Sequence, residues 1–143
     1  MEVLGIDIGS YGIKGAIVDT EKGEIISDKK STGKIKDTRP HKLISQLHKV
    51  VKKFDWKGPI GCAFPAATTR GRILATDRIH EAWIDADAEQ LFSEITGCKV
   101  SVINDTDATG LAEMSFGVGK GHTGTVIVLA VGTGIGSSLF VNK

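Results

Sequence analysis

The chain has 143 residues, of which 41% are hydrophobic, and its 18 Lys and Arg nearly balance its 17 Asp and Glu. This length and composition predict one α/β domain with a single core, and no apolar stretch is long enough to span a membrane. The first strand-like run begins at Val3 without a basic, apolar leader, so we expect a cytoplasmic protein.

The first part of the chain is typical of an antiparallel meander followed by a helix. Apolar runs separated by turn residues predict strands at 3–8, 13–19 and 24–30. A helix is predicted from 41 to 54, with Pro40 in its first turn. The apolar residues of this helix recur at spacings of three and four, so they share one face: Leu43, Leu47, Val50, Val51 and Phe54.

The second part alternates strands with helices. We expect, in chain order, a strand at 59–64, a polar excursion at 68–77, a helix at 87–96, a strand at 100–104, a helix at 108–116 and a hairpin of strands at 125–131 and 137–141. An isolated hairpin would expose apolar strand residues such as Val126, Val128 and Leu139, which favours self-association.

The first candidate site is the turn DIGSYGIKG at 7–15. Asp7 follows a buried strand, and Gly9 and Gly12 permit a tight reversal whose backbone N–H groups can approach an anion. A carboxylate is costly to bury there unless it meets a cation or a donor, so Asp7 can hold a hydrated metal ion while Lys14 adds positive charge. An ordinary hairpin turn with a solvated Asp explains the same residues about equally well.

The second candidate site is NDTD at 104–107, between a strand and a helix. Asp105 would lie where helix N-terminal amides favour an anion, and a carboxylate placed there can accept a proton from an attacking hydroxyl. Alternatively, Asn104, Asp105 or Thr106 is a helix cap and nothing more.

The third candidate site is GTGIG at 132–136, the turn of the last predicted hairpin. No helical pattern follows its glycines, so it is neither a dinucleotide-binding turn nor a P-loop. Two glycine turns near opposite ends of the chain would suit a phosphate chain that is held from both sides.

Together these motifs resemble the ROK branch of the sugar kinases that share the actin, hexokinase and Hsp70 fold, and within it the polyphosphate glucokinases. The similarity covers the whole length and is carried by LGIDIGSYGIKGAIVDTEKGEI at 4–25, GPIGCAFPA at 58–66, AWIDAD at 82–87, INDTDATGLAEMSFGVGKG at 103–121 and VLAVGTGIGSSLFV at 128–141. The resemblance implies an RNase H-like N-terminal lobe of order βββαβαβα over 1–121, and the first β-hairpin of a second lobe over 122–143.

The resemblance also implies an activity and its cofactors. The family transfers a phosphoryl group from polyphosphate or ATP to the 6-hydroxyl of glucose with Mg²⁺, and its full-length members are expected to be homodimers. Two-lobed subunits run to roughly 250 residues, so we expect this chain to be a fragment that is inactive by itself. Neither a membrane nor a nucleic acid is an expected partner, because few aromatics accompany the basic residues and no nucleic-acid motif is present.

Site residues follow from the resemblance position by position. Asp105 matches the catalytic base, and Asp7 matches a residue that positions Mg²⁺ through water. The substrate-binding positions are Asn104, Pro65 and Arg78. The phosphate-binding positions are Asp7, Gly9, Ser10, Gly12, Lys14, Gly132, Thr133, Gly134 and Gly136.

Two residues depart from the family pattern. Ser10 stands where a second glycine is usual, and Arg78 stands where an Asn five residues before Trp83 usually contacts the sugar. Arg78 therefore keeps open an ATP-dependent kinase for another hexose or an amino sugar. A non-catalytic sugar-binding module of the same fold is a further alternative, although a regulator would need a DNA-binding segment ahead of the first strand.

Basic residues are concentrated in one part of the chain. Ten of the 18 Lys and Arg lie within 29–57, an excess that would attract polyphosphate. The alternative is that these residues form the solvated face of the first helix. Cys62 and Cys98 lie in apolar segments without metal-ligand spacing, so we expect two reduced thiols.

Overall fold

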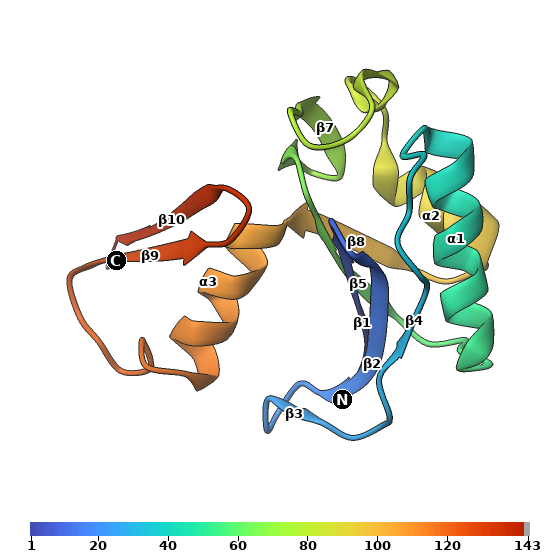
Figure 1. The fold of residues 1–143 in the computed structure, drawn as a ribbon. Coiled ribbons are helices and arrows are strands. Elements are labelled where there is room, and N and C mark those ends of the chain that lie inside the picture. Colours follow the sequence, from blue (N-terminus) through green and yellow to red (C-terminus); the bar gives the residue numbers. More distant parts are fainter. Residues whose placement is uncertain (142–143) are drawn as a thin grey trace.

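The computed structural model describes residues 1–141 and shows a mixed sheet with helices on both sides (Figure 1). The first elements in the chain are β1 (Glu2–Gly9), β2 (Gly12–Asp19), β3 (Glu24–Ile25), β4 (Lys30–Ser31) and α1 (Pro40–Lys53). They are followed by β5 (Ile60–Phe64), β6 (Ala67–Thr69), β7 (Arg72–Ala75), the 3-10 turn η1 (Glu81–Trp83), α2 (Ala88–Thr96), β8 (Val100–Asn104), α3 (Asp105–Phe116), β9 (Thr125–Val131) and β10 (Ile135–Val141).

The main sheet has the strand order β3-β2-β1-β5-β8, with β4 pairing to β2 beside β3. The meander strands β1 and β2 are antiparallel, whereas β1, β5 and β8 are parallel. Because parallel strands end at the same edge of a sheet, the segments that follow β1, β5 and β8 meet at one edge.

The core lies between the sheet and the pair α1 and α2, which cover one of its faces (Figure 1). The predicted apolar face of α1 is confirmed, since Leu43, Leu47, Val50 and Val51 are all buried. Three aromatic rings form the centre of the core, with the Trp83 ring 5.0 Å from Phe64 and 5.8 Å from Phe92. The Trp83 Nε1 donates to the Thr38 carbonyl at 2.8 Å, so the buried indole has a partner.

The third predicted strand, 24–30, is wrong as a continuous element. Ile26 N still donates to Ile17 O, but Ile17 N donates to the Ser27 hydroxyl at 2.8 Å instead of to a backbone carbonyl. The Ser27 side chain therefore replaces one ladder acceptor, and the chain separates into the short strands β3 and β4.

Two further segments differ from the predicted boundaries. The polar excursion contains a hairpin, β6 and β7, whose turn has positive φ at Arg70 (47°) and Gly71 (77°). Helix α3 begins at Asp105 rather than Ala108, because the Asn104 side chain caps it. Among the helices within residues 1–141, none is both long and apolar enough to cross a bilayer.

The hairpin of β9 and β10 is a separate two-stranded sheet that packs against α3 (Figure 1). Small residues set this contact: a side chain at Gly110 would collide with Ser138 and Phe140, and one at Gly136 would collide with Thr106. The division into a lobe at 1–121 and the start of a second lobe at 122–143 remains a proposal.

Candidate functional site

A cleft of about 870 Å³ opens where the parallel strands end. Asp7 on β1 is level with Ala63 on β5, which is level with Ile103 on β8. Asp105 comes two residues later, so the register brings the first two sequence motifs to one place. The tip of the β9–β10 hairpin, Gly132 to Gly136, forms the opposite wall of the cleft.

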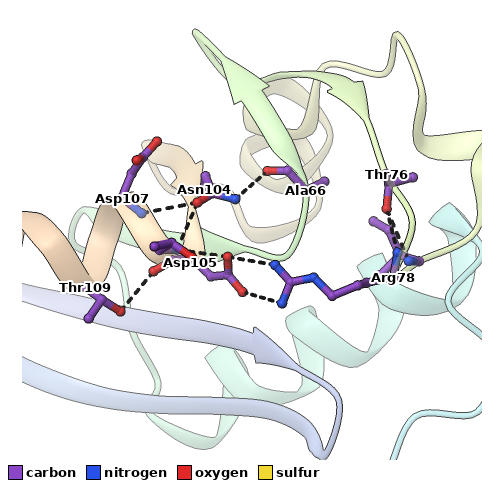
Figure 2. A network of polar contacts seen from close by, with 9 residues as sticks. Ala66, Thr76, Arg78, Asn104, Asp105, Asp107 and Thr109 are labelled. Atoms are coloured by element: carbon purple, nitrogen blue, oxygen red, sulfur yellow. Dashed lines mark hydrogen bonds and ion pairs between the residues drawn. The ribbon is translucent and has the colours of Figure 1, made fainter. Parts of the chain in front are cut away.

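Asn104 and Asp105 are held rigidly at the junction of β8 and α3 (Figure 2). The Asn104 Oδ1 accepts from the backbone N–H of Thr106 at 2.9 Å and of Asp107 at 3.2 Å, which makes Asn104 the N-cap. Its Nδ2 donates to the Ala66 carbonyl at 3.0 Å. The cap prediction is therefore confirmed for Asn104. Its second Nδ2 hydrogen has no partner within residues 1–141, and Asn104 itself is not among the residues that line the cleft.

Asp105 shares its carboxylate between the helix and Arg78. Its Oδ1 accepts from Thr106 N at 2.9 Å and from Arg78 Nη2 at 3.2 Å, while its Oδ2 lies 3.1 Å from Arg78 Nη1. Figure 2 shows the guanidinium of Arg78 facing this carboxylate in a two-pronged pair. The Asp105 side chain is 23% exposed, so its remaining surface faces the cleft.

Asp7 lies near the end of β1 and is accessible from the same cleft. The protein around it removes part of its hydration, which raises the pKa of its carboxyl; the charge of Lys14 lowers that pKa and the charge of Asp105 raises it. Lys14 on β2 lies opposite Asp7 on β1 in the strand register. It lines a second hollow of about 620 Å³ beside the cleft. Asp7 thus lies between the two hollows, with Lys14 in one and Asp105 in the other.

The first glycine turn is packed more tightly than the sequence suggested. Gly12 has φ of 114°, and a Cβ there would lie 2.6 Å from the Gly33 carbonyl oxygen. The Thr32 hydroxyl accepts from Ile13 N at 3.0 Å, so that amide already has a partner. Gly12 therefore accommodates the Thr32–Gly33 segment, while Ser10 is the turn residue that lines the cleft. Gly9 pairs with Gly12 at the end of the ladder.

The second glycine turn is open to the cleft. Gly132 N donates to the Gly134 carbonyl at 2.9 Å, and nothing lies within 4 Å of a Cβ built at either glycine. Thr133 and Gly136 line the same wall. The backbone of this turn can therefore approach a ligand closely.

Pro65 is buried in the loop after β5, next to Ala66, whose carbonyl holds Asn104. Pro65, which was predicted to bind the substrate, is not among the residues that line the cleft. Three polar residues that line the cleft were not predicted as binding or catalytic residues: Asp77, Thr109, and Thr106, which was considered only as a helix cap. Thr109 was recognisable, because it lies four residues after Asp105 on a helix and its hydroxyl donates to the Asp105 carbonyl at 3.1 Å.

The side chains of the cleft would bind a metal ion only together with ligands from water or from a bound phosphate. Within residues 1–141, no group of three His, Cys, Asp or Glu side chains could hold a metal ion. Mg²⁺ usually keeps several waters and needs only one or two carboxylates together with phosphate oxygens. Asp7 therefore suits an Mg²⁺ ion that arrives with a phosphate donor.

Some of the basic residues at 29–57 have structural contacts. Lys30 Nζ lies 4.7 Å from the centre of the Phe54 ring, and Lys53 Nζ donates to the Ser31 carbonyl at 2.8 Å, which ties β4 to α1. Lys34, Lys36 and Lys42 instead line a shallow hollow of about 420 Å³ together with Thr32, Gly33 and the carboxylate Asp37, which is paired with Arg39. Two of its lining residues, Thr32 and Gly33, pack against Gly12 of the first glycine turn. Cys62 and Cys98 form no disulfide, as predicted, and both are buried.

Comparisons with known proteins agree with this arrangement. The chain matches the model of the ROK family over residues 3–143. It is 37% identical to a polyphosphate glucokinase of Mycobacterium tuberculosis over 140 residues, which are 97% of this chain and 53% of that protein. The chain therefore spans about half the length of the curated relatives that it matches.

Solved structures show the same likeness. An inorganic polyphosphate/ATP-glucomannokinase from Arthrobacter sp. strain KM superposes with a TM-score of 0.93 at 34% identity, covering 99% of this chain and 58% of that one. A ROK family glucokinase from Streptomyces griseus, solved in complex with glucose and AMPPNP, superposes with a TM-score of 0.76 at 26% identity, covering 99% and 48%. The predicted α/β fold of the actin-like sugar kinases is thereby confirmed, and this chain belongs to the ROK family.

Proposed function

We propose that this chain is the acceptor-binding lobe of a sugar kinase that transfers a phosphoryl group from polyphosphate, or from ATP, to the 6-hydroxyl of glucose. The observation that carries the proposal is the convergence of Asp7, Asp105 and the turn Gly132–Gly136 on one cleft. The names of the relatives in Mycobacterium tuberculosis and Arthrobacter support the choice of donor and acceptor.

In this proposal Asp105 accepts the proton of the attacking hydroxyl. Its carboxylate is fixed by Thr106 N at the start of α3 and faces the cleft. A positioned carboxylate of this kind assists phosphoryl transfer by orienting and deprotonating the nucleophile. Asn104 orients the sugar with its one remaining amide hydrogen, since its other polar groups are engaged by Ala66, Thr106 and Asp107.

The donor phosphates lie, in the same proposal, between the two glycine turns. The open backbone at Thr133 and Gly134 supplies N–H groups on one side, and Ser10 faces the cleft from the other. Mg²⁺ held by Asp7 and by the donor would neutralise charge on the transferred group. Because the carboxylates Asp7 and Asp77 line the cleft beside the Arg78–Asp105 ion pair, that neutralisation would favour the entry of a polyanion.

Polyphosphate is favoured over ATP by the basic hollow beside the first glycine turn. Lys34, Lys36 and Lys42 could contact the distal part of a long donor whose reacting end lies near Asp105. Changing all three to Gln is expected to weaken binding of long-chain polyphosphate and to leave ATP binding unchanged. A triple Gln variant at Lys49, Lys57 and Lys99 carries the same charge change outside the hollow and serves as the control. Equal loss in both triple variants would show that net charge alone attracts the donor.

A kinase for an amino sugar is the second candidate. Arg78, in the cleft beside Asp105, is the observation that favours it. A putative N-acetylmannosamine kinase from Listeria monocytogenes superposes with a TM-score of 0.83 at 26% identity. Titrations of the chain with glucose, mannose and N-acetylmannosamine separate the two candidates.

Acceptor binding tests the proposed function on this chain by itself. We expect the chain to bind glucose weakly, by ligand-observed NMR, and the Asn104→Ala variant to lose this binding. An Asp87→Ala variant is the control, because Asp87 caps α2 through Gln90 N as Asn104 caps α3, but it caps a different helix. Unchanged glucose binding in Asn104→Ala would contradict the proposal.

A further inference from the structure

Arg78 holds the carboxylate that the proposed reaction requires. Its two terminal nitrogens face the two oxygens of Asp105 at 3.2 and 3.1 Å (Figure 2). Such a two-pronged pair combines charge with fixed geometry. The guanidinium therefore lies on the side of Asp105 that faces the cleft, where an acceptor hydroxyl would have to approach.

The backbone that carries Arg78 is anchored, whereas its side chain has room to move. The Thr76 hydroxyl accepts from Arg78 N at 3.3 Å and from Ile79 N at 3.2 Å, and His80 N donates to the Thr38 hydroxyl at 2.9 Å. The Arg78 side chain itself is 40% exposed. It can therefore leave Asp105 for solvent without unfolding its loop.

Asp105 keeps its position without Arg78. Its Oδ1 also accepts from Thr106 N at 2.9 Å, within the first turn of α3, and its backbone is fixed by the Asn104 cap. Removing the guanidinium would thus free Oδ2 and part of Oδ1 while the carboxylate stays oriented.

We propose that Arg78 limits the affinity for the acceptor, because its guanidinium competes with the acceptor hydroxyl for Asp105. The proposal rests on the proposed function, and it adds that an acceptor binds productively only by displacing the guanidinium. An acceptor therefore binds more weakly than the cleft alone would allow. Every sugar that approaches Asp105 with a single hydroxyl bears this same cost, so Arg78 lowers the affinity for each of them by the same factor.

The test is a comparison of glucose affinity in the full chain and in the variant Arg78→Asn. We expect Arg78→Asn to bind glucose about two- to fivefold more tightly, the range that a partly exposed ion pair allows. Arg78→Lys is expected to fall between the two, because an ammonium cannot form the two-pronged pair. Added salt should tighten glucose binding to the wild-type chain and leave Arg78→Asn unchanged, since salt screens the ion pair but not a neutral sugar.

Two controls separate competition from a change in folding. Arg70→Asn makes the same substitution in the β6–β7 turn, away from the residues that line the cleft, and should leave the affinity unchanged. In an Asp105→Asn background the guanidinium has no carboxylate to hold, so adding Arg78→Asn should give no further gain. A gain of equal size in both backgrounds would overturn the inference.

The remaining outcomes are also decisive. Weaker glucose binding in Arg78→Asn would make Arg78 a sugar contact and would overturn competition. Equal affinity in the wild-type chain and Arg78→Asn would overturn it while leaving the proposed function standing, because the acceptor still binds. Absence of glucose, mannose and N-acetylmannosamine binding in every variant would count against the proposed function as well.

Discussion

The main sheet and the β9–β10 hairpin both contain apolar strands, but these strands are buried in the main sheet and half exposed in the hairpin. In the lobe, alternate residues of β5 such as Ile60 and Phe64 are at most 2% exposed, because α1 and α2 cover them. In the hairpin, the residues of β9 that point away from α3, Ile127 and Leu129, are 62% and 64% exposed. Apolar sequence therefore predicts a strand but does not show whether another element covers it.

The outer face of the hairpin is continuous. Strand pairing places Leu139 opposite Ile127, Ser137 opposite Leu129 and Ile135 opposite Val131. Its large apolar residues are all exposed: Ile127, Leu129, Val131, Ile135, Leu139 and Val141. Relatives that match the chain are about twice as long. We propose that this face is where the second lobe would continue.

The largest expected difference between the lobe and the hairpin is in the effect of a truncated side chain on stability. Trp83→Ala removes a ring that is 0% exposed and in contact with Phe64 and Phe92, so we expect a loss of about 3–5 kcal/mol in the free energy of unfolding. Leu129→Ala in the hairpin should change it by less than about 0.5 kcal/mol. Urea denaturation measures both, and equal losses would contradict the comparison.

The exposed face of the hairpin should make the chain self-associate. Each Ile or Leu that is buried in such a contact contributes about 1.5–3 kcal/mol, so Ile127→Lys with Leu129→Lys should raise the dissociation constant at least about a hundredfold. Leu74→Lys is the control, because Leu74 is 52% exposed but lies on the β6–β7 hairpin. Sedimentation velocity would contradict this prediction if the unmodified chain stayed monomeric at every concentration.

The attachment of the hairpin to α3 depends on Gly136, where there is no side chain to collide with the helix. Gly136→Val would collide with Thr106 and is expected to weaken this contact by about 1–3 kcal/mol. Gly134→Val, with nothing within 4 Å, should have little effect on the contact. Hydrogen exchange of the β9 and β10 amides reports the difference. Unchanged exchange in Gly136→Val would show that the hairpin is held elsewhere.

The smallest expected effect concerns Asp7 and pH. Because the pKa of Asp7 is raised above its ordinary 3.8 in the folded state, the fold binds this proton more tightly than the unfolded chain does. The contribution of Asp7 to stability is thus most favourable below that value and declines as pH rises through the raised pKa. Asp7→Asn should remove this decline and stabilise the chain near pH 7. If the free energy of unfolding of Asp7→Asn depended on pH as that of the unmodified chain does, the raised pKa of Asp7 would be contradicted.

Much of the fold was predictable because local signals agreed with the final contacts. The spacing of Leu43, Leu47 and Val50 predicted the buried face of α1, and the apolar runs predicted β1, β5 and β8. The break between β3 and β4 was not predictable, because it depends on the Ser27 hydroxyl meeting Ile17 N across the sheet. The predicted exposure of Val126 and Val128 was also wrong, because both side chains are half-buried on the face of the hairpin that packs against α3. Leu139, the third residue predicted to be exposed, is exposed.

The candidate site was predictable as motifs but not as geometry. Asp7, Asp105 and Gly132–Gly136 were identified from their order. The strand register brings Asp7 and Asp105 to one cleft, and the packing of the hairpin on α3 adds the glycine turn. The packing of Thr32 against Gly12 and the pair between Arg78 and Asp105 join residues that are 20 and 27 positions apart. No local pattern specifies such contacts, since they arise only when the sheet and its loops assemble.

Phosphoryl transfer is the measurement that tests the central claim most directly. The chain would be joined, at the end of the region that it shares with the Mycobacterium tuberculosis polyphosphate glucokinase, to the remainder of that relative, and glucose 6-phosphate formation would be followed with Mg²⁺ and either polyphosphate or ATP. We predict transfer by this chimera and its loss, without loss of folding, when Asp105 is changed to Asn. Undiminished transfer by the Asp105→Asn chimera would contradict the assignment of this cleft as the site of reaction.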